Sequence, residues 1–154
     1  MKIGGLLENS GLTLYRITQA EDKPGVAGSI LKFYAQRNIN LEYLTEASTE
    51  GGRVVIQLCI ESSYVPEVEK YMTENPENIR GLHIKRIDDV STFAIYGPHF
   101  REKPGIAARF CTYIGHAGIN IYGISSSVSS VCCIIKSSDV SAARKAVLSY
   151  FELP

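Results

Sequence analysis

The sequence contains an internal repeat, and this repeat limits the possible folds more than any other feature of the chain. Residues 22–44 align with residues 102–124 over 23 positions without a gap, at a shift of 80 residues. Six positions of the alignment are identical, namely Lys23/Lys103, Pro24/Pro104, Gly25/Gly105, Ala27/Ala107, Ile39/Ile119 and Asn40/Asn120. A chain of 154 residues with such a repeat is expected to form two small copies of one unit.

A second block of similarity lies further along the chain, at a shift of 75 residues. It matches Ser62, Ser63 and Val65 with Ser137, Ser138 and Val140. The second copy is therefore five residues shorter between the two blocks. Because chain length varies most easily in surface turns, we expect the extra residues in a turn at residues 48–53.

Each copy predicts the same order of elements, βαββαβ. Runs of β-branched and aromatic residues predict strands at residues 12–18, 39–47, 54–60 and 82–84, and in the second copy at 92–97, 119–126 and 131–135. Apolar residues at helical spacing predict helices from residues 26 and 65, and from 106 and 140. The third strand alternates apolar and polar residues, which indicates an antiparallel sheet with helices on one face. The predicted class is α+β, with two tandem ferredoxin-like βαββαβ domains.

The repeat also predicts where the domains begin and end. We expect a first domain at residues 8–89 and a second at residues 90–154. The second copy lacks its last strand, because only Glu152, Leu153 and Pro154 follow its second helix. The N-terminal segment 2–7, KIGGLL, has no place in the first copy, so we expect it to complete the second sheet.

Composition excludes several classes of function. Sixteen Lys and Arg balance 16 Asp and Glu, and this neutral charge argues against a nucleic acid or a membrane as partner. The sequence shows neither a membrane helix nor a signal peptide, so we expect a cytoplasmic protein. The four cysteines show no CxxC spacing, which favours reduced thiols over a disulfide. The histidines show no ligand spacing, and we expect neither a metal nor a cofactor.

Two ferredoxin-like repeats, each with an acidic-Lys-Pro-Gly turn and a later Ile-Asn, resemble tandem ACT domains, which are small regulatory modules that bind amino acids. The chain is most similar to the C-terminal regulatory region of aspartokinases. The resemblance extends from the entry segment KIGGLLENSGLTLYRIT to the serine-rich ISSS and the ending YFEL. The kinase domain of that family has no counterpart in this sequence. The resemblance therefore implies a free-standing ACT protein, a separate regulatory subunit or an excised fragment.

The resemblance implies a ligand site between the loop after the first strand and the start of the second strand, often that of a neighbouring domain. The implied residues are Asp22, Lys23, Pro24, Gly25, Val26, Ala27, Asn40, Leu41 and Glu42 in the first copy, and Glu102, Lys103, Pro104, Gly105, Ile106, Ala107, Asn120 and Ile121 in the second. A helix N-terminus after Pro-Gly offers N–H donors to the carboxylate of an amino acid. Asp22 and Asn40 offer acceptors to its ammonium group.

The two implied sites differ at one position, where Tyr122 stands in place of Glu42. Glu42 would reach the charged end of a basic ligand, so lysine is a candidate beside threonine. Each site residue also has a simpler interpretation, with the Pro-Gly segments as plain turns, the asparagines as turn residues and the acids as helix caps. The charged stretch 67–77 is interpreted as a solvated helix face. The resemblance favours the first copy as the binding site.

Three functions compete. The leading hypothesis is a non-catalytic amino-acid sensor that forms a homodimer and regulates a biosynthetic kinase. The second is an interaction module without ligand binding. The third, an enzyme, is the weakest, because the sequence shows no Ser–His–Asp or Cys–His set, no paired carboxylates and no phosphate loop.

Overall fold

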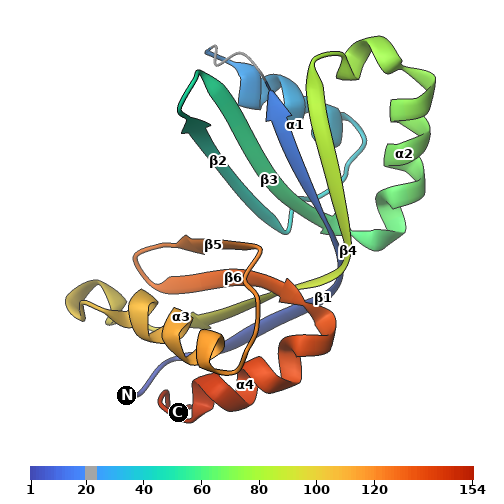
Figure 1. The fold of residues 1–154 in the computed structure, drawn as a ribbon. Coiled ribbons are helices and arrows are strands. Elements are labelled where there is room, and N and C mark those ends of the chain that lie inside the picture. Colours follow the sequence, from blue (N-terminus) through green and yellow to red (C-terminus); the bar gives the residue numbers. More distant parts are fainter. Residues whose placement is uncertain (20–23) are drawn as a thin grey trace. The chain divides into compact units, whose positions relative to one another are not determined.

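The structure is a computed structural model that describes residues 1–19 and 24–154 (Figure 1). The chain divides into two compact units. One is continuous in sequence, Leu12–Asp88, and we call it the contiguous unit. The other combines Met1–Gly11 with Asp89–Pro154, and we call it the composite unit.

The contiguous unit is built in the order βαββαβ. Its elements are residues 12–19 of β1 (Gly5–Gln19), α1 (Val26–Gln36), β2 (Tyr43–Thr49), β3 (Arg53–Glu61), α2 (Val65–Glu74) and residues 82–88 of β4 (Leu82–Tyr96). Short 3₁₀ turns at Ser62–Tyr64 and Pro76–Ile79 flank α2. The strand order is β2-β3-β1-β4, and β3 pairs antiparallel with both β1 and β2. The predicted α+β class with antiparallel strands is confirmed.

The composite unit begins with residues 89–96 of β4. It continues through a 3₁₀ turn (Phe100–Glu102), α3 (Ile106–His116), β5 (Gly123–Ser126), β6 (Ser130–Lys136), a second turn (Ser137–Asp139) and α4 (Val140–Leu148). Its strand order is β1-β4-β6-β5, with residues 5–11 of β1 at one edge. The N-terminal segment is tied in by its backbone, because Gly4 N donates to Tyr96 O at 2.7 Å and Ile3 N to Glu152 O at 2.9 Å.

Each unit has its own apolar core between its strands and its helices (Figure 1). The alternating face of β3 is buried as the sequence predicted, and Val54, Ile56, Leu58 and Ile60 are all at most 1% exposed. In the composite unit the rings of Phe93 on β4 and Phe110 on α3 stack with their centroids 6.0 Å apart. These packed faces stabilise each unit mainly through apolar burial.

β2 and β5 begin four residues later than predicted, at Tyr43 and Gly123 instead of residues 39 and 119. The reason is that Ile39 and Ile119 close the helices that precede them. The N–H of Ile39 donates to Tyr34 O, and that of Ile119 to Ile114 O. The residues just before them, Asn38 and Gly118, have positive φ angles of 55° and 73°, as in the common left-handed helix ending.

The predicted strands 82–84 and 92–97 are the two ends of one continuous strand, β4. Likewise β1 is one strand that includes the predicted strand 12–18 and part of segment 2–7. Each of these strands has a left-handed residue where the chain passes from one unit to the other, Gly11 with φ 74° and Asp89 with φ 54°. Because polar residues and glycine surround these two points, the strand pattern is interrupted there in the sequence.

Candidate functional site

The starts of α1 and α3 have the same backbone geometry. Gly25 caps α1 with φ 89° and ψ −1°, and Gly105 caps α3 with φ 89° and ψ 1°. Among the described residues, neither helix has a side chain hydrogen-bonded as its cap. The first-turn N–H groups of both helices are therefore left for solvent or for an anionic group, and the helix dipole favours the anion.

The residues of the first implied loop are only partly described. Asp22 and Lys23 lie outside the described residues, and Val26 is placed only as the first residue of α1. Pro24 and Gly25 are exposed, and Ala27 packs against the core of the contiguous unit. The described part of this loop thus offers backbone N–H groups rather than polar side chains.

The second implied loop is described completely. Lys103, Pro104, Gly105 and Ala107 are exposed, whereas Ile106 is 5% exposed and belongs to the core. Glu102 ends the 3₁₀ turn, and its carboxylate lies 3.6 Å from Nδ1 of His99. The side chain of Ile106 therefore has a packing role, and only its backbone faces the helix start.

The implied residues before β2 and β5 form the other half of each site. Asn40 donates from Nδ2 to Oε1 of Glu42 at 3.4 Å, and Glu42 N donates to Cys59 O at 2.8 Å. Leu41 packs against the core of the contiguous unit, as Ile121 does in the composite unit. Asn120 is exposed. In the second copy the ring at the position of Glu42, Tyr122, has the ammonium of Lys136 5.8 Å from its centroid.

The structure does not bring the two halves of a site together within one unit. They lie at opposite ends of α1, whose 11 residues make a helix about 16 Å long at 1.5 Å per residue. The same separation holds for α3, which also has 11 residues. A small ligand that contacts both halves therefore needs one half from a second copy of the loop.

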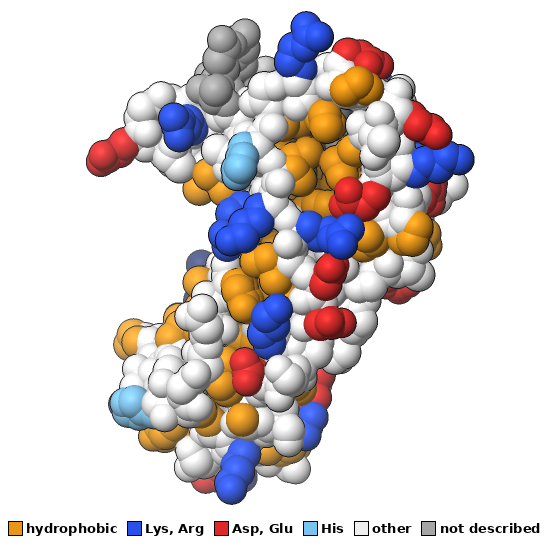
Figure 2. Space-filling model, turned by 45° about the vertical axis from the view of Figure 1, so that its right-hand side comes forward, with side chains coloured by type: hydrophobic (Ala, Val, Ile, Leu, Met, Phe, Trp, Pro, Cys, Tyr) orange, Lys and Arg blue, Asp and Glu red, His pale blue; other side chains and the backbone are white. Residues whose placement is uncertain are grey.

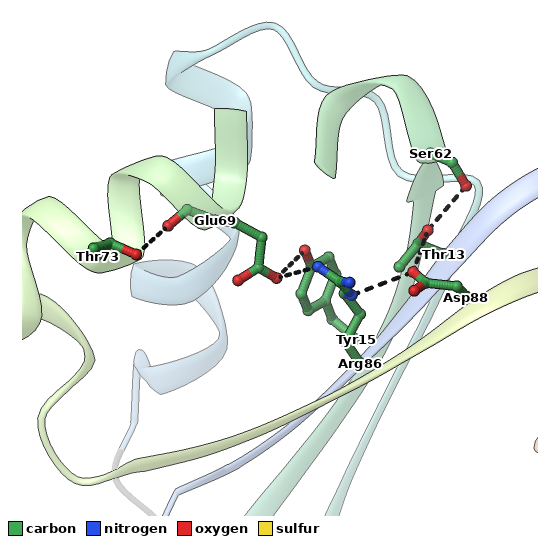
Figure 3. A network of polar contacts seen from close by, with 7 residues as sticks. All are labelled: Thr13, Tyr15, Ser62, Glu69, Thr73, Arg86 and Asp88. Carbon is green, nitrogen blue, oxygen red and sulfur yellow. Dashed lines mark hydrogen bonds and ion pairs between the residues drawn. The ribbon is translucent and has the colours of Figure 1, made fainter. Parts of the chain in front are cut away.

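Sequence analysis missed a polar network in the contiguous unit (Figure 3). The hydroxyl of Tyr15 on β1 donates to Oε1 of Glu69 on α2 at 2.9 Å. Arg86 on β4 lies 3.1 Å from the same carboxylate oxygen and 3.3 Å from Asp88 Oδ1. Thr13 extends the network to Ser62 at 2.9 Å and to Asp88 at 3.3 Å.

This network corrects the interpretation of residues 67–77 as a solvated face, because Glu69 holds a buried hydroxyl. Burial and the hydrogen bond to Glu69 raise the pKa of Tyr15 well above its usual range. One signal in the sequence was the phenol itself. Tyr15 occupies a core-facing position of a strand, and a buried phenol requires a hydrogen-bond partner.

Other kinds of site have little support in the described part of the chain. No group of three or more His, Cys, Asp or Glu there could hold a metal ion. The four cysteines are free thiols, and burial raises the pKa of Cys111, Cys132 and Cys133. Such thiols are poor nucleophiles. No helix among the described residues is long and apolar enough to cross a membrane.

Comparison with known families identifies the class of the protein. Residues 93–151, which run from β4 past the end of α4, match the ACT domain family. The chain is therefore an ACT-domain protein with a ferredoxin-like α+β fold, and it resembles the regulatory region of aspartokinases. The aspartokinase of Mycolicibacterium smegmatis is 25% identical over 134 residues, which are 86% of this chain and 32% of that protein. The chain thus spans about a third of the length of the curated relatives that it matches.

Solved structures show the same fold. The regulatory subunit of aspartate kinase from Thermus thermophilus superposes with a TM-score of 0.84 at 20% identity, covering 97% of this chain and 99% of that one. Aspartate kinase from Synechocystis gives a TM-score of 0.87 at 22% identity, over 99% of this chain and 28% of that one. Aspartokinase III of E. coli, in a T-state complex with lysine and aspartate, gives 0.71 at 15% identity, over 96% of this chain and 32% of that one.

Proposed function

We propose that this chain is a non-catalytic regulatory module that binds an amino acid. The observation that carries the proposal is the pair of uncapped helix starts at Gly25 and Gly105, which share one unusual backbone geometry. A left-handed glycine before the first turn leaves the N–H groups open, as a carboxylate ligand requires. The likeness to aspartokinase regulatory regions supports a role in which ligand binding is read by an enzyme.

We further propose that both units are ACT domains. In this proposal the first domain spans residues 8–89 and the second spans residues 90–154, completed by segment 2–7. The family match covers the second of these domains. The matching strand orders, β2-β3-β1-β4 and β1-β4-β6-β5, support the same assignment for the first.

The first copy is the proposed amino-acid site. The ligand carboxylate would accept from the N–H groups that follow Gly25, and its ammonium group would donate to Asn40, with Asp22 as a further acceptor. Glu42 lies beside Asn40 and would receive a basic side chain, so a lysine-like ligand is preferred to threonine. Tyr122 removes this acid from the second copy. The E. coli structure whose description includes lysine supports testing that ligand first.

The separation of about 16 Å between the ends of α1 makes the site a shared one. We propose that two chains form a homodimer in which the helix start of one chain meets Asn40 and Glu42 of its partner. An aspartokinase-type biosynthetic kinase in the cytoplasm is the proposed target, since one similar structure contains aspartokinase alpha and beta subunits.

Isothermal titration calorimetry with the twenty amino acids tests the proposal. Lysine or threonine is expected to bind at millimolar concentration or below, and Asn40→Ala is expected to weaken binding at least tenfold. Asn120→Ala, the matched change in the second copy, should leave the affinity nearly unchanged. Absence of binding by any amino acid at millimolar concentration, alone or with a partner kinase, would overturn the proposal.

A second candidate, an interaction module without a ligand, is favoured by one observation. Leu44 on β2 and Ile124 on β5 occupy equivalent positions of the repeat and are 44% and 43% exposed. Both lie on strands at a sheet edge, where a second chain can pair. This candidate predicts a dimer that forms without ligand and is unaffected by Asp22→Ala or Asn40→Ala, as sedimentation analysis would record.

A further inference from the structure

The helix-covered side of the contiguous unit contains an open groove of about 450 Å³. Ile30 on α1 and Met72 on α2 line its sides, and Ile17 on β1 and Ile84 on β4 line its floor. Figure 2 shows hydrophobic side chains gathered in a hollow in the upper part of the view. Ile30, Met72 and Ile84 pack against the core of this unit and are still only partly buried. Apolar surface of this kind gains free energy when it is covered.

The composite unit fills the corresponding space with two aromatic side chains. Phe110 on α3 stands at the repeat position of Ile30 and is fully buried. Phe151, three residues after the end of α4, is 1% exposed and packs into the same core. Three residues after the end of α2 stands Glu77, which is exposed. The groove therefore exists because the contiguous unit lacks both aromatic plugs.

The polar residues around the groove favour a negatively charged group. Lys32 and Arg80 line it, and among its described lining residues none carries a carboxylate. Neither cation forms an ion pair with another described residue. Glu69, in the adjoining hollow, is already engaged by Tyr15 and Arg86. An anion at the groove would thus meet two available cations and no competing acid in its described lining.

The groove is closed between its two helices. Phe33 on α1 and Tyr71 on α2 both line it, and their ring centroids are 4.4 Å apart. The guanidinium of Arg37 lies 4.2 Å from the Phe33 ring and 4.1 Å from the Tyr71 ring. The amide of Asn78 donates to the Tyr71 hydroxyl at 2.7 Å. This stack bridges the helices, so the space suits a compact molecule rather than a helix laid along a trough.

We propose that this groove binds a small organic anion with an apolar body, such as a medium-chain carboxylate. The apolar body covers Ile30, Met72 and Ile84, and the anionic head lies between Lys32 and Arg80. The volume falls within the roughly 300–1,000 Å³ of ordinary small-molecule sites. This site shares no residue with the proposed amino-acid contacts and is a second ligand site on the same unit.

Methyl NMR titration of the full chain with octanoate tests the proposal, with octan-1-ol as the uncharged counterpart. The methyl signals of Ile84 and Met72 are expected to shift with a Kd near or below about 1 mM, as ten non-hydrogen atoms allow. The signal of Ile114, in the composite core, should not shift. Ile30→Phe, which copies Phe110, is expected to weaken both ligands at least tenfold. Ile84→Trp fills the groove from the opposite side, in case the first variant fails to fold.

The charge of the ligand is tested separately. Lys32→Glu combined with Arg80→Glu is expected to weaken octanoate about fivefold or more and to leave octan-1-ol within about twofold. Lys145→Glu on α4 is the matched control and should change neither affinity. Asn40→Ala should leave octanoate binding intact, so this proposal and the amino-acid site fail independently.

Three results would overturn the proposal. One is the absence of any shift at about 10 mM octanoate, a concentration well above the expected Kd. Another is unchanged octanoate binding in a folded Ile30→Phe or Ile84→Trp variant. The third is equal affinity for octanoate and octan-1-ol that the charge reversal does not alter. In that case the groove is an apolar surface for a peptide or another chain.

Discussion

Gly105 shows how a single backbone angle determines which residue a position accepts. Its φ of 89° is unfavourable for residues with a Cβ, although a Cβ built there would meet no atom within 4 Å. The cost of a substitution is therefore backbone strain alone. We expect Gly105→Val to lower the free energy of unfolding by about 1–2 kcal/mol, and Gly105→Asn by less.

Urea denaturation measures this difference, and Gly115→Ala in the same helix is the control. Gly115 has an ordinary φ and open space around its Cβ position, so alanine should stabilise the protein by about 0.5–1 kcal/mol. Equal losses at both glycines would show that lost chain flexibility, not the left-handed angle, governs this position.

Two buried tyrosines predict how stability changes at alkaline pH. Burial and the neighbouring Glu69 raise the pKa values of Tyr15 and Tyr34 above the value of about 10 in the unfolded chain. The unfolded state therefore loses these protons first. Stability is fully present below pH 10 and falls above it, by up to about 1.4 kcal/mol per pH unit for each tyrosine.

Urea unfolding between pH 9 and pH 11 checks this sign. Tyr34→Phe should reduce the slope of stability against pH, because one titrating group is lost. A stability that stays constant or rises across this range in the unmodified chain would contradict the prediction.

Among the elements, α2 is connected to two strands by the network around Glu69. Its carboxylate accepts from Tyr15 on β1 and from Arg86 on β4. We expect Glu69→Ala to lower the free energy of unfolding by about 1–2 kcal/mol, because a buried phenol then loses its acceptor. Glu67→Ala, an exposed change on the same helix, should cost less than about 0.5 kcal/mol.

A double-mutant cycle isolates the bond from the rest of the helix. Tyr15→Phe removes the donor, so Glu69→Ala should cost less in that background than in the unmodified chain. Additive losses would mean that the hydroxyl and the carboxylate do not act together.

The elements also show what sequence reasoning could reach. The helices and β3 were predictable, because apolar spacing of 3.6 or 2 residues directly reflects which face is buried. The bond between Tyr15 and Glu69 was not, since it joins residues 54 positions apart. The groove was equally hidden, because it depends on what the contiguous unit lacks beside Ile30. Of the candidate site, the repeat predicted the matching glycine caps but not the length of helix between its two halves.

For the whole molecule, the two chain ends meet within the composite unit. Met1 N donates to Tyr150 O at 2.9 Å, and Glu152 N donates to Met1 O at 2.8 Å. A short glycine-serine linker from Pro154 to Met1 should therefore be tolerated. New ends at the exposed Gly51 and Gly52 turn should also be tolerated, because such turns accept breaks.

We expect this circular permutant to fold with an unfolding midpoint within a few degrees of the parent, as thermal circular dichroism would record. A permutant opened inside β4, between Asp88 and Asp89, is the contrasting variant and should be markedly less stable. Loss of structure in the first permutant would contradict the packing of residues 1–4 against Tyr96 and Glu152.

The composite unit has a consequence for the order of events during synthesis. Residues of the contiguous unit all precede position 89, so this unit has its complete sequence once Asp88 has left the ribosome. The composite unit needs Met1–Gly11 together with a segment that ends at Pro154. Because chains emerge from the N-terminus, the first residues made wait for the last before their strand gains its neighbours. The second half of the protein is thus completed by its beginning, only after translation has ended.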